Sequence, residues 1–295
     1  MTKILLLINP HARSGQETKD QVAISLKEMG YEIIEPDQHK QPYDPNELIL
    51  KYKELVSFVV IGGGDGSVNA ALPALMETQI PLVVIPLGTA NNLARSFSIP
   101  NDYQSAIQLI KHGEEKTIDV GMVNGIPFLN VAGLGLSTEV NRHVSKQLKK
   151  YLGVGAFILT AVKMAIQMNP FRAEIVVDGG KPIFTKSWQI SVCNGKYYGS
   201  GLAIKEDASL NDVKLHLLST EVKKWWHSIT MISSFMTGKF KKDDDVTLVS
   251  GREIVVQTRR RFSIDVDGDL KTITPAKFHV IPRALRIMTP VASAG

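Results

Sequence analysis

The sequence lacks several features that would assign it to common protein classes. Its 295 residues include one cysteine, Cys193, so an internal disulfide framework is excluded and a reducing cytosol fits. The seven histidines are scattered singly, without the paired spacing that builds a zinc site. No internal repeat and no low-complexity tract occurs, which excludes solenoid and fibrous architectures.

Long hydrophobic runs are also missing. The longest apolar stretch, residues 151–168, contains Lys163 and two early glycines, and its continuous part is too short to cross a bilayer core of about 30 Å. Met1-Thr2-Lys3 leads directly into a strand-like run, without the basic flank, apolar region and cleavage site of a signal peptide. We expect a cytoplasmic protein without a transmembrane segment, peripheral at most to the inner membrane surface.

The composition is that of a globular chain with a modest excess of positive charge. Hydrophobic residues make up 44% and charged residues 21%, and the formal net charge is +5. This charge suits an anionic partner, namely a nucleotide, a membrane surface or a nucleic acid. No motif supports nucleic-acid binding, so we expect none. The sequence does not decide the oligomeric state, and a homodimer is among the states that it allows.

The first third of the chain alternates strand-like and helical patterns. Residues 4–8 form a continuous apolar run, typical of a strand buried on both faces of a parallel sheet. A helical pattern follows over residues 17–29, and Asp44 suits the N-cap of a second helix. Two further strands, residues 58–61 and 82–85, each lead into a loop. The alternation predicts a doubly wound, Rossmann-like α/β domain with ligands at the carboxyl ends of the strands.

After about Asp119 the pattern changes to short alternating strands separated by turn residues. The expected strands are residues 173–178, 187–194, 213–218, 252–257, 262–266 and 277–282. They predict a second, mainly antiparallel β-sandwich domain. We expect residues 1–122 to form the nucleotide-binding domain and residues 123–295 the substrate domain, with the last residues able to return to the first domain.

The loop Gly62-Gly63-Gly64-Asp65-Gly66-Ser67 follows the third expected strand. Glycines let backbone N–H groups approach an anion closely, because no Cβ stands in the way. Asp65 would repel a phosphate unless a cation lay between them, so it indicates Mg²⁺ held directly or through water. A tight strand-to-helix turn with an Asp cap explains the same residues without a ligand, and this alternative stays open.

A second loop, residues 86–92, follows the next strand and should lie beside the first at the same sheet edge. Gly88 permits close approach, the Thr89 hydroxyl can bond a phosphate, and Asn91 and Asn92 can bind or orient other groups. The same residues suit an N-cap cluster for the following helix. Both interpretations can hold together.

Three motifs occur in order: Asn9-Pro10 with Arg13-Ser14-Gly15, then Gly63-Gly64-Asp65-Gly66-Ser67, then Pro86-Leu87-Gly88-Thr89-Ala90-Asn91-Asn92-Leu93-Ala94. The second half adds Phe128-Leu129-Asn130-Val131-Ala132-Gly133-Leu134-Gly135, Asn194-Gly195 and Asp267-Gly268-Asp269. Together they resemble the diacylglycerol kinase catalytic domain over nearly the whole chain; that family includes bacterial lipid kinases and sphingosine and ceramide kinases. The glycine-Asp-glycine motif alone is shared with NAD kinases and phosphofructokinases, so the first domain is expected to have their fold.

The resemblance implies an ATP-dependent, Mg²⁺-dependent kinase acting on a lipid hydroxyl at the membrane surface, most simply that of diacylglycerol. The residues that it places around the nucleotide phosphates are Asn9, Ser14, Gly63, Gly64, Asp65, Gly66, Ser67 and Thr89. The residues that it implies for metal binding are Asp65, Asp119 and Asp212. Turn chemistry explains Asp212 equally well. The residues implied in catalysis are Asp65, Asn92 and Asp269.

Two departures from the family pattern bear on activity. Asn92 stands where the family usually has an Asp that completes the Mg²⁺–water network. Asp269 stands where the family has a Glu, the proposed general base, which must reach roughly 2.6–3.2 Å from the hydroxyl. A nucleotide- or lipid-binding regulator with weak or no kinase activity is therefore an alternative, and an NAD-kinase-like enzyme for a soluble alcohol is another.

Two further features suit either a membrane surface or ordinary structure. Residues 222–236 place Trp225 and Trp226 at helical spacing beside lysines, which fits an interfacial helix or one packed on the β domain. The basic clusters at residues 142–150, 239–242 and 259–261 could attract anionic lipid, or form solvated faces.

Overall fold

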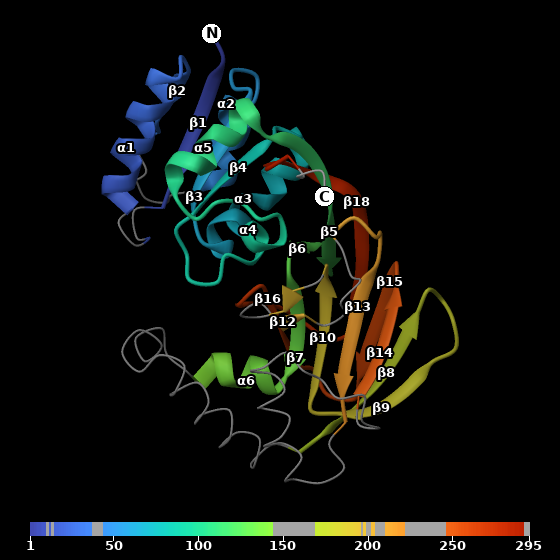
Figure 1. The fold of residues 1–295 in the computed structure, drawn as a ribbon. Coiled ribbons are helices and arrows are strands. Elements are labelled where there is room, and N and C mark those ends of the chain that lie inside the picture. Colours follow the sequence, from blue (N-terminus) through green and yellow to red (C-terminus); the bar gives the residue numbers. More distant parts are fainter. Residues whose placement is uncertain are drawn as a thin grey trace. The chain divides into compact units, whose positions relative to one another are not determined.

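The structure is a computed structural model that describes residues 1–9, 12, 15–36, 44–143, 169–195, 197–198, 202–203, 210–221 and 246–291. Ser14 and the amphipathic stretch at residues 222–236 lie outside the described residues. The chain separates into a first unit, Met1–Val120 with Pro282–Gly295, and a second unit, Gly121–Ile281 (Figure 1). Among the described residues, no helix is long and apolar enough to cross a membrane.

The first unit is built on a parallel sheet. Its order is β2 (Glu32–Ile34), β1 (Lys3–Ile8), β3 (Phe58–Gly63) and β4 (Leu82–Pro86). The end of β18 (Ala276–Thr289) adds beside β4 in parallel, with Ile287 opposite Leu82. The strands β1, β3 and β4 are almost wholly buried, which is why they are continuous apolar runs rather than alternating ones. The predicted doubly wound α/β domain is confirmed.

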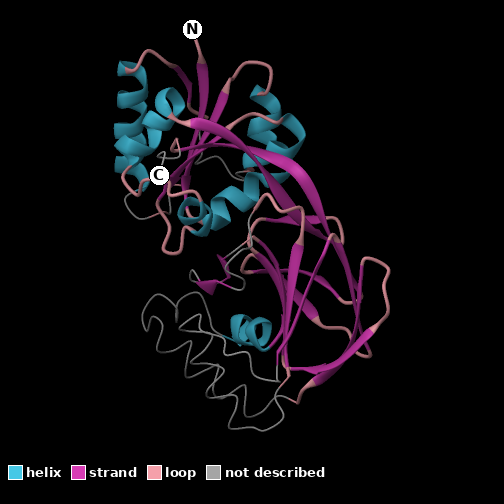
Figure 2. Cartoon of the chain, turned by 45° about the vertical axis from the view of Figure 1, so that its right-hand side comes forward, coloured by secondary structure: helices cyan, strands magenta, loops and turns pink. Residues whose placement is uncertain are grey.

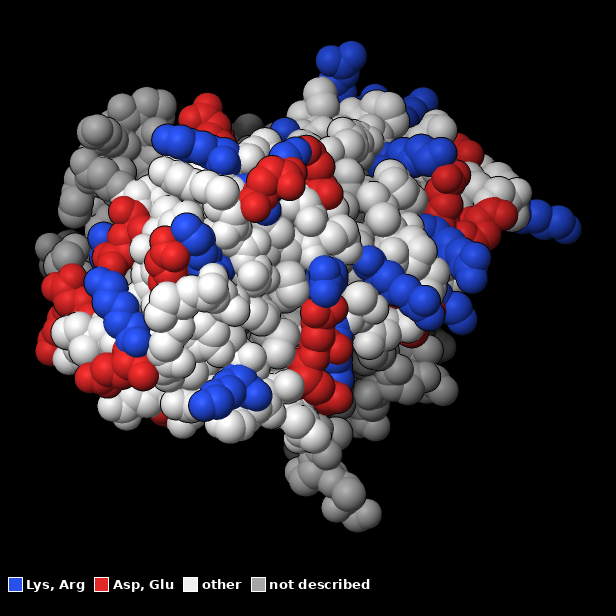
Figure 3. All heavy atoms as spheres, turned by 90° about the horizontal axis from the view of Figure 1, so that it is seen from above, with Lys and Arg blue, Asp and Glu red and all other residues white. Residues whose placement is uncertain are grey.

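Helices lie on both sides of this sheet (Figure 2). They are α1 (Gly15–Glu28), α2 (Pro45–Tyr52), α3 (Asp65–Thr78), α4 (Asn92–Ser96) and α5 (Tyr103–His112). α1 packs against α5, and α2 packs against α3. The predicted N-cap is confirmed: the Asp44 carboxylate accepts the Asn46 N–H at 2.8 Å. Lysine and arginine are interspersed with aspartate and glutamate over the face seen in Figure 3.

The second unit contains a six-stranded antiparallel sheet. Its order is β14 (Val246–Gly251), β13 (Leu215–Thr220), β10 (Gln189–Asn194), β7 (Val131–Gly135), β16 (Ser263–Val266) and β17 (Asp269–Ile273). The β13 strand begins two residues later than predicted. Val213 adopts φ 56, a left-handed conformation that ends any extended run at that point.

A second layer completes the sandwich. It comprises the first part of β18, β15 (Glu253–Thr258), β8 (Phe171–Val177) and β9 (Ile183–Ser187). β5 (Glu114–Val123) and β6 (Ile126–Phe128) form a hairpin. α6 (Leu136–His143) and the short pair β11 (Tyr197–Tyr198) and β12 (Leu202–Ala203) are the other elements described.

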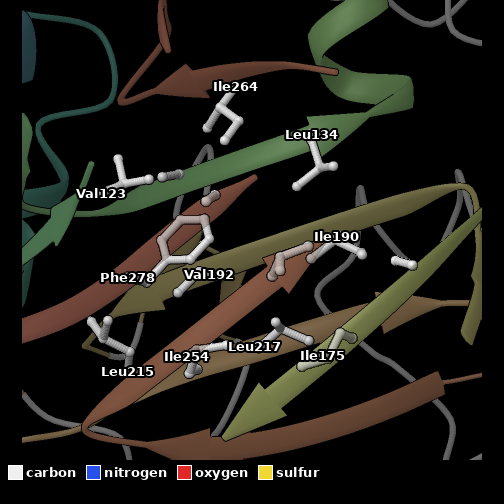
Figure 4. Close-up of a cluster of buried hydrophobic side chains, with 14 of the residues drawn as sticks. Val123, Leu134, Ile175, Ile190, Val192, Leu215, Leu217, Ile254, Ile264 and Phe278 are labelled. Carbon is white, nitrogen blue, oxygen red and sulfur yellow. The ribbon is translucent and has the colours of Figure 1, made fainter. Parts of the chain in front are cut away.

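Apolar side chains from both layers meet in one buried core (Figure 4). Leu134, Ile190 and Leu217 come from the six-stranded sheet, and Ile254 and Phe278 come from the second layer; all five are fully buried. Alternate residues of each strand therefore point into the core, which explains the period-two pattern of the sequence. The predicted antiparallel β-sandwich is confirmed.

The β5–β6 hairpin depends on one asparagine. Asn124 and Gly125 form a two-residue turn with φ 48 and 82, as a type I′ turn requires. The Asn124 side-chain Nδ2 lies 3.1 Å from Thr272 Oγ1 and 3.2 Å from the carbonyl oxygens of Ile273 and Pro275. Its Oδ1 accepts the Lys277 N–H at 2.9 Å. The residue therefore shapes its own turn and fastens the turn before β18.

Two substitutions separate these contributions of Asn124. Asn124→Gly keeps the left-handed backbone and loses the side-chain bonds, so we expect the free energy of unfolding to fall by about 1 kcal/mol. Asn124→Ala also places an intolerant residue at positive φ, so we expect a further loss of about 1 kcal/mol. Urea unfolding measures both. Equal stability of the two variants would show that the backbone conformation contributes nothing.

Candidate functional site

Two loops meet at the carboxyl edge of the parallel sheet in the first unit. β3 ends at Gly63, and Gly63 pairs with Pro86 at the end of β4. A Cβ added to Gly88 would collide with the Cα of Gly64, so the two backbones are in direct contact. The predicted adjacency of the loops is confirmed, and the contact requires that residue 88 has no side chain, whereas a Cβ on Gly64 would lie 3.1 Å from the Gly88 Cα.

The glycines of the first loop serve internal packing. A Cβ on Gly62 would lie 2.9 Å from Cγ1 of Ile8, and one on Gly63 would collide with the Ser67 hydroxyl. At Gly66, in the first turn of α3, a Cβ would meet nothing within 4 Å. The sequence pattern attributed the glycines to the approach of an anion. In the structure they bring the loop against its neighbours, and only the side of Gly66 faces open space.

Other predicted phosphate residues lie at the same edge. Asn9 follows β1, its N–H donates to the Gly62 carbonyl at 2.8 Å, and its Nδ2 donates to Ser67 Oγ at 3.2 Å. Thr89 is exposed in the second loop. Asn91 instead folds back on its own loop, since its Oδ1 accepts the Gly88 N–H at 3.0 Å and its Nδ2 donates to the Gly88 carbonyl at 2.9 Å. Asn91 therefore shapes the loop.

Asp65 joins the two loops. Its Oδ2 accepts the Asn92 N–H at 3.1 Å and its Oδ1 accepts the Leu93 N–H at 3.2 Å. These are the first two residues of α4, whose N-terminal N–H groups lack partners within the helix. The Asp65 carboxylate is therefore an N-terminal cap donated from another loop, and its negative charge lies at the end of α4 that favours it.

Asn69 is a site residue that the sequence analysis did not select. It lies one helical turn after Asp65, and both polar atoms of its side chain are buried without a hydrogen-bond partner among the described residues. Leaving such an amide unsatisfied costs about 1–3 kcal/mol, so buried amides of this kind are rare unless water or a ligand completes them. In the sequence, Asn69 is a polar residue between two apolar ones, Val68 and Ala71, both of which are buried in the structure. This pattern is the signal that could have pointed to Asn69.

The other two predicted metal residues lie in different surroundings. Asp119, on β5, is 3% exposed and accepts the N–H of Arg283, where β18 turns through φ 51. Asp212 closes a turn in the second unit: its Oδ1 accepts the Lys214 N–H at 3.0 Å and its Oδ2 lies 3.0 Å from His216 Nε2. The opposite ring nitrogen of His216 lies 2.8 Å from Ser250 Oγ.

These surroundings decide where Mg²⁺ fits. Within the described ranges, no group of three or more His, Cys, Asp or Glu side chains could hold a metal ion. Mg²⁺ commonly keeps several waters and takes one or two carboxylates together with substrate phosphates. Asp65 fits that mode because it lies at the edge where the predicted phosphate residues gather. Asp119 is buried and Asp212 forms a turn, and both stay predictions as metal residues.

The Asp267-Gly268-Asp269 turn divides its two acids between different tasks. Asp267 accepts the N–H groups of residues 129, 130 and 131 at 2.8, 3.0 and 2.8 Å, so it holds the start of β7. Burial, and secondarily the charge of Asp267, raises the pKa of the Cys193 thiol well above its usual value. Asp269 is 63% exposed, with Lys271 Nζ 3.9 Å away. Asp269 alone of the two acids is exposed enough to meet a substrate.

Two family descriptions match the chain. The diacylglycerol kinase catalytic domain matches residues 3–123, and the YegS C-terminal NAD kinase beta sandwich-like domain matches residues 130–289. A diacylglycerol kinase from Bacillus subtilis is 28% identical over 239 residues, covering 80% of this chain and 78% of that protein. An uncharacterised protein from Synechocystis is 29% identical over 246 residues, covering 81% of this chain and only 56% of its own length.

A solved structure shows the same fold. A candidate diacylglycerol kinase from Bacillus anthracis superposes with a TM-score of 0.80 at 23% identity, covering 98% of this chain and 96% of that one. At that identity the likeness establishes the arrangement of the elements and leaves the chemistry to the site residues.

Asp65 should contribute to stability even without a ligand. Asp65→Asn replaces one acceptor oxygen with a donor, so one cap bond to α4 is lost and we expect the free energy of unfolding to fall by about 1 kcal/mol. The measurement is urea unfolding without nucleotide or Mg²⁺. The exposed Asp20→Asn in α1 is the matched control and should change little. Equal stability of the two variants would contradict the capping role.

Proposed function

The chain belongs to the family of the diacylglycerol kinase catalytic domain, and from this premise we propose that it transfers the γ-phosphoryl group of ATP to the hydroxyl of a lipid, diacylglycerol or a close relative. The observation that carries the proposal is the pair of joined loops. The Gly64–Gly88 contact and the Asp65 cap hold two neighbouring loops at one sheet edge, where α/β folds bind phosphates.

The first unit would hold the nucleotide. The open side of Gly66 gives the first turn of α3 access to a phosphate, and helix N-termini favour negative charge. Ser67, already oriented by Asn9, and the exposed Thr89 would donate hydroxyl hydrogens to phosphate oxygens. Mg²⁺ held near Asp65 would supply positive charge against the charge that develops on the transferred group.

Asp269 would be the general base. Asp269 would accept the proton of the lipid hydroxyl at a carboxylate oxygen, while the hydroxyl oxygen bonds to the γ-phosphorus and ADP leaves. Asp267 would act as a positioning residue, since its bonds to residues 129–131 fix the turn that carries Asp269.

A direct test follows labelled phosphate from ATP to a panel of dispersed lipids, with NAD as a soluble acceptor. We expect transfer to diacylglycerol or a related lipid, and a kcat lower by roughly 100-fold or more in Asp269→Asn, since a general base contributes that much. Stability should not change, because the Asp269 side chain is exposed. Lys271→Gln is the neighbouring control. Equal turnover in Asp269→Asn, or transfer to NAD alone, would count against the proposal.

One observation favours a second candidate, a nucleotide-binding regulator with little turnover. Both carboxylate oxygens of Asp65 bind the backbone of α4, and Asn92, where the family has an acid, is only 6% exposed. The acidic charge available to a metal at this edge is therefore small.

Asn92→Asp distinguishes the two candidates. A weakened kinase should gain turnover, roughly tenfold or more, because a second carboxylate strengthens the metal site. A regulator should bind nucleotide and show the same little or no turnover in both forms. The measurement is labelled phosphate transfer over a range of Mg²⁺ concentrations, with nucleotide affinity measured on the same samples. If Asn92→Asp needs a lower Mg²⁺ concentration for turnover than wild type, the weakened kinase is supported. If the Mg²⁺ concentration needed is unchanged, the missing acid at position 92 does not explain a low turnover.

A further inference from the structure

Three positive side chains gather at one end of β8, β9 and β15 in the second layer of the sandwich. β8 and β9 pair with Arg172 opposite Lys186. β15 and β8 pair up to Thr258 opposite Ala173, and Arg259 follows directly after the end of β15. Arg172, Lys186 and Arg259 are all exposed, and their strand neighbours Ala173 and Thr185 are buried. We call Lys186, Arg172 and Arg259 the cation row.

The cation row is electrostatically unfavourable in the isolated protein. Directly opposite residues of an antiparallel pair have Cβ atoms only about 5 Å apart, and like charges in such pairs destabilise the sheet. Among the described residues, none of the three forms an ion pair. Glu174 is the acid on the same face, and its partner on β9 is Phe184 rather than a cation. An external anionic surface would remove the repulsion.

An exposed aromatic ring accompanies the row. Phe184 lies two residues before Lys186 on β9, so both side chains point from the same face, and Phe184 is 75% exposed. β9 forms the free end of the strand order in its sheet (Figure 1). A large apolar side chain beside cations is the combination that enters the boundary between lipid headgroups and acyl chains.

The adjoining segment supplies two more cations in a fixed conformation. Arg260 and Arg261 are exposed, and the Arg260 carbonyl accepts the Thr258 hydroxyl at 2.6 Å. The Phe262 N–H donates to Thr274 Oγ1 at 2.9 Å, so both ends of this short segment are tied down. By contrast, positive and negative side chains are mixed over the face shown in Figure 3. At the cation row Arg172, Lys186 and Arg259 are positive, and Glu174 lies beside Arg172 on the same face of β8.

We propose that the cation row, with Phe184 and the adjoining Arg260 and Arg261, is the surface by which the protein docks on an anionic lipid membrane. The proposal rests on the proposed function, because a kinase for a membrane lipid must reach its acceptor at a bilayer surface. Charge complementarity to acidic headgroups supplies the attraction, and insertion of Phe184 selects a bilayer over an acidic protein or a nucleic acid.

The test is sedimentation of the full chain with phosphatidylcholine vesicles that contain phosphatidylglycerol, without ATP. Arg172→Gln with Lys186→Gln should weaken binding by about 25-fold, because each cation near an anionic membrane is worth about fivefold in affinity. Phe184→Ser should weaken it by about tenfold. Lys111→Gln with Lys214→Gln changes the net charge equally at other exposed lysines and should leave binding within about twofold. Added salt should weaken wild-type binding steeply.

The outcomes separate this inference from the proposed function. If wild type does not bind these vesicles, or if both double variants bind alike, the docking surface is wrong, even where wild type phosphorylates a detergent-dispersed lipid. Nucleic-acid binding is the alternative outcome. If Arg172→Gln with Lys186→Gln binds a nucleic acid more weakly than wild type does, while its affinity for vesicles is unchanged, the inference is also overturned. If vesicle binding depends on the row but no acceptor is phosphorylated, the docking surface stands and the kinase proposal fails.

Discussion

The contact between the backbones of Gly64 and Gly88 is the constraint on which the candidate site depends. It brings together the two loops that follow β3 and β4, and Asp65 then spans the junction to cap α4. The first turn of α3 and the exposed Thr89 consequently belong to one rigid edge. N–H and hydroxyl donors that the fold has already fixed would bind the proposed phosphate with little loss of conformational entropy.

Burial assigns different tasks to acids that look alike in the sequence. Asp119 and Asp267 are held by backbone N–H groups, which makes each a structural anchor for a bend in the chain. Asp65 caps α4 at the edge where we propose that phosphate binds, and Asp269 is exposed at a turn whose geometry its neighbour fixes. A charge in a buried position needs partners, so acids with complete partner sets are poorly placed to meet a ligand.

In the sandwich, every second residue along a strand is apolar and points into the core. The residues between them point outward, where packing does not decide their identity. Ala173, Ile175 and Thr185 fill the interior, so Arg172 and Lys186 must point outward whatever their cost to one another. The same alternation that builds the core therefore decides which cations share a face. Function at a lipid surface would use a pattern that the fold already imposes.

The sequence by itself determined the alternation of strands and helices, the antiparallel sandwich, the Asp44 cap and the meeting of the two loops. Hydrophobic periodicity, cap residues and turn residues act over a few positions, so they can be read locally. Only the tertiary structure decided that Asp65 caps α4 and that the side-chain amide of Asn69 is buried with no hydrogen-bond partner in the part of the chain that the structure describes. It alone also showed that Gly88 needs its lack of a side chain because it lies against Gly64, and that Arg172 lies opposite Lys186. These facts depend on residues far apart in the chain, whose pairing is set by register and packing, and no local pattern records them.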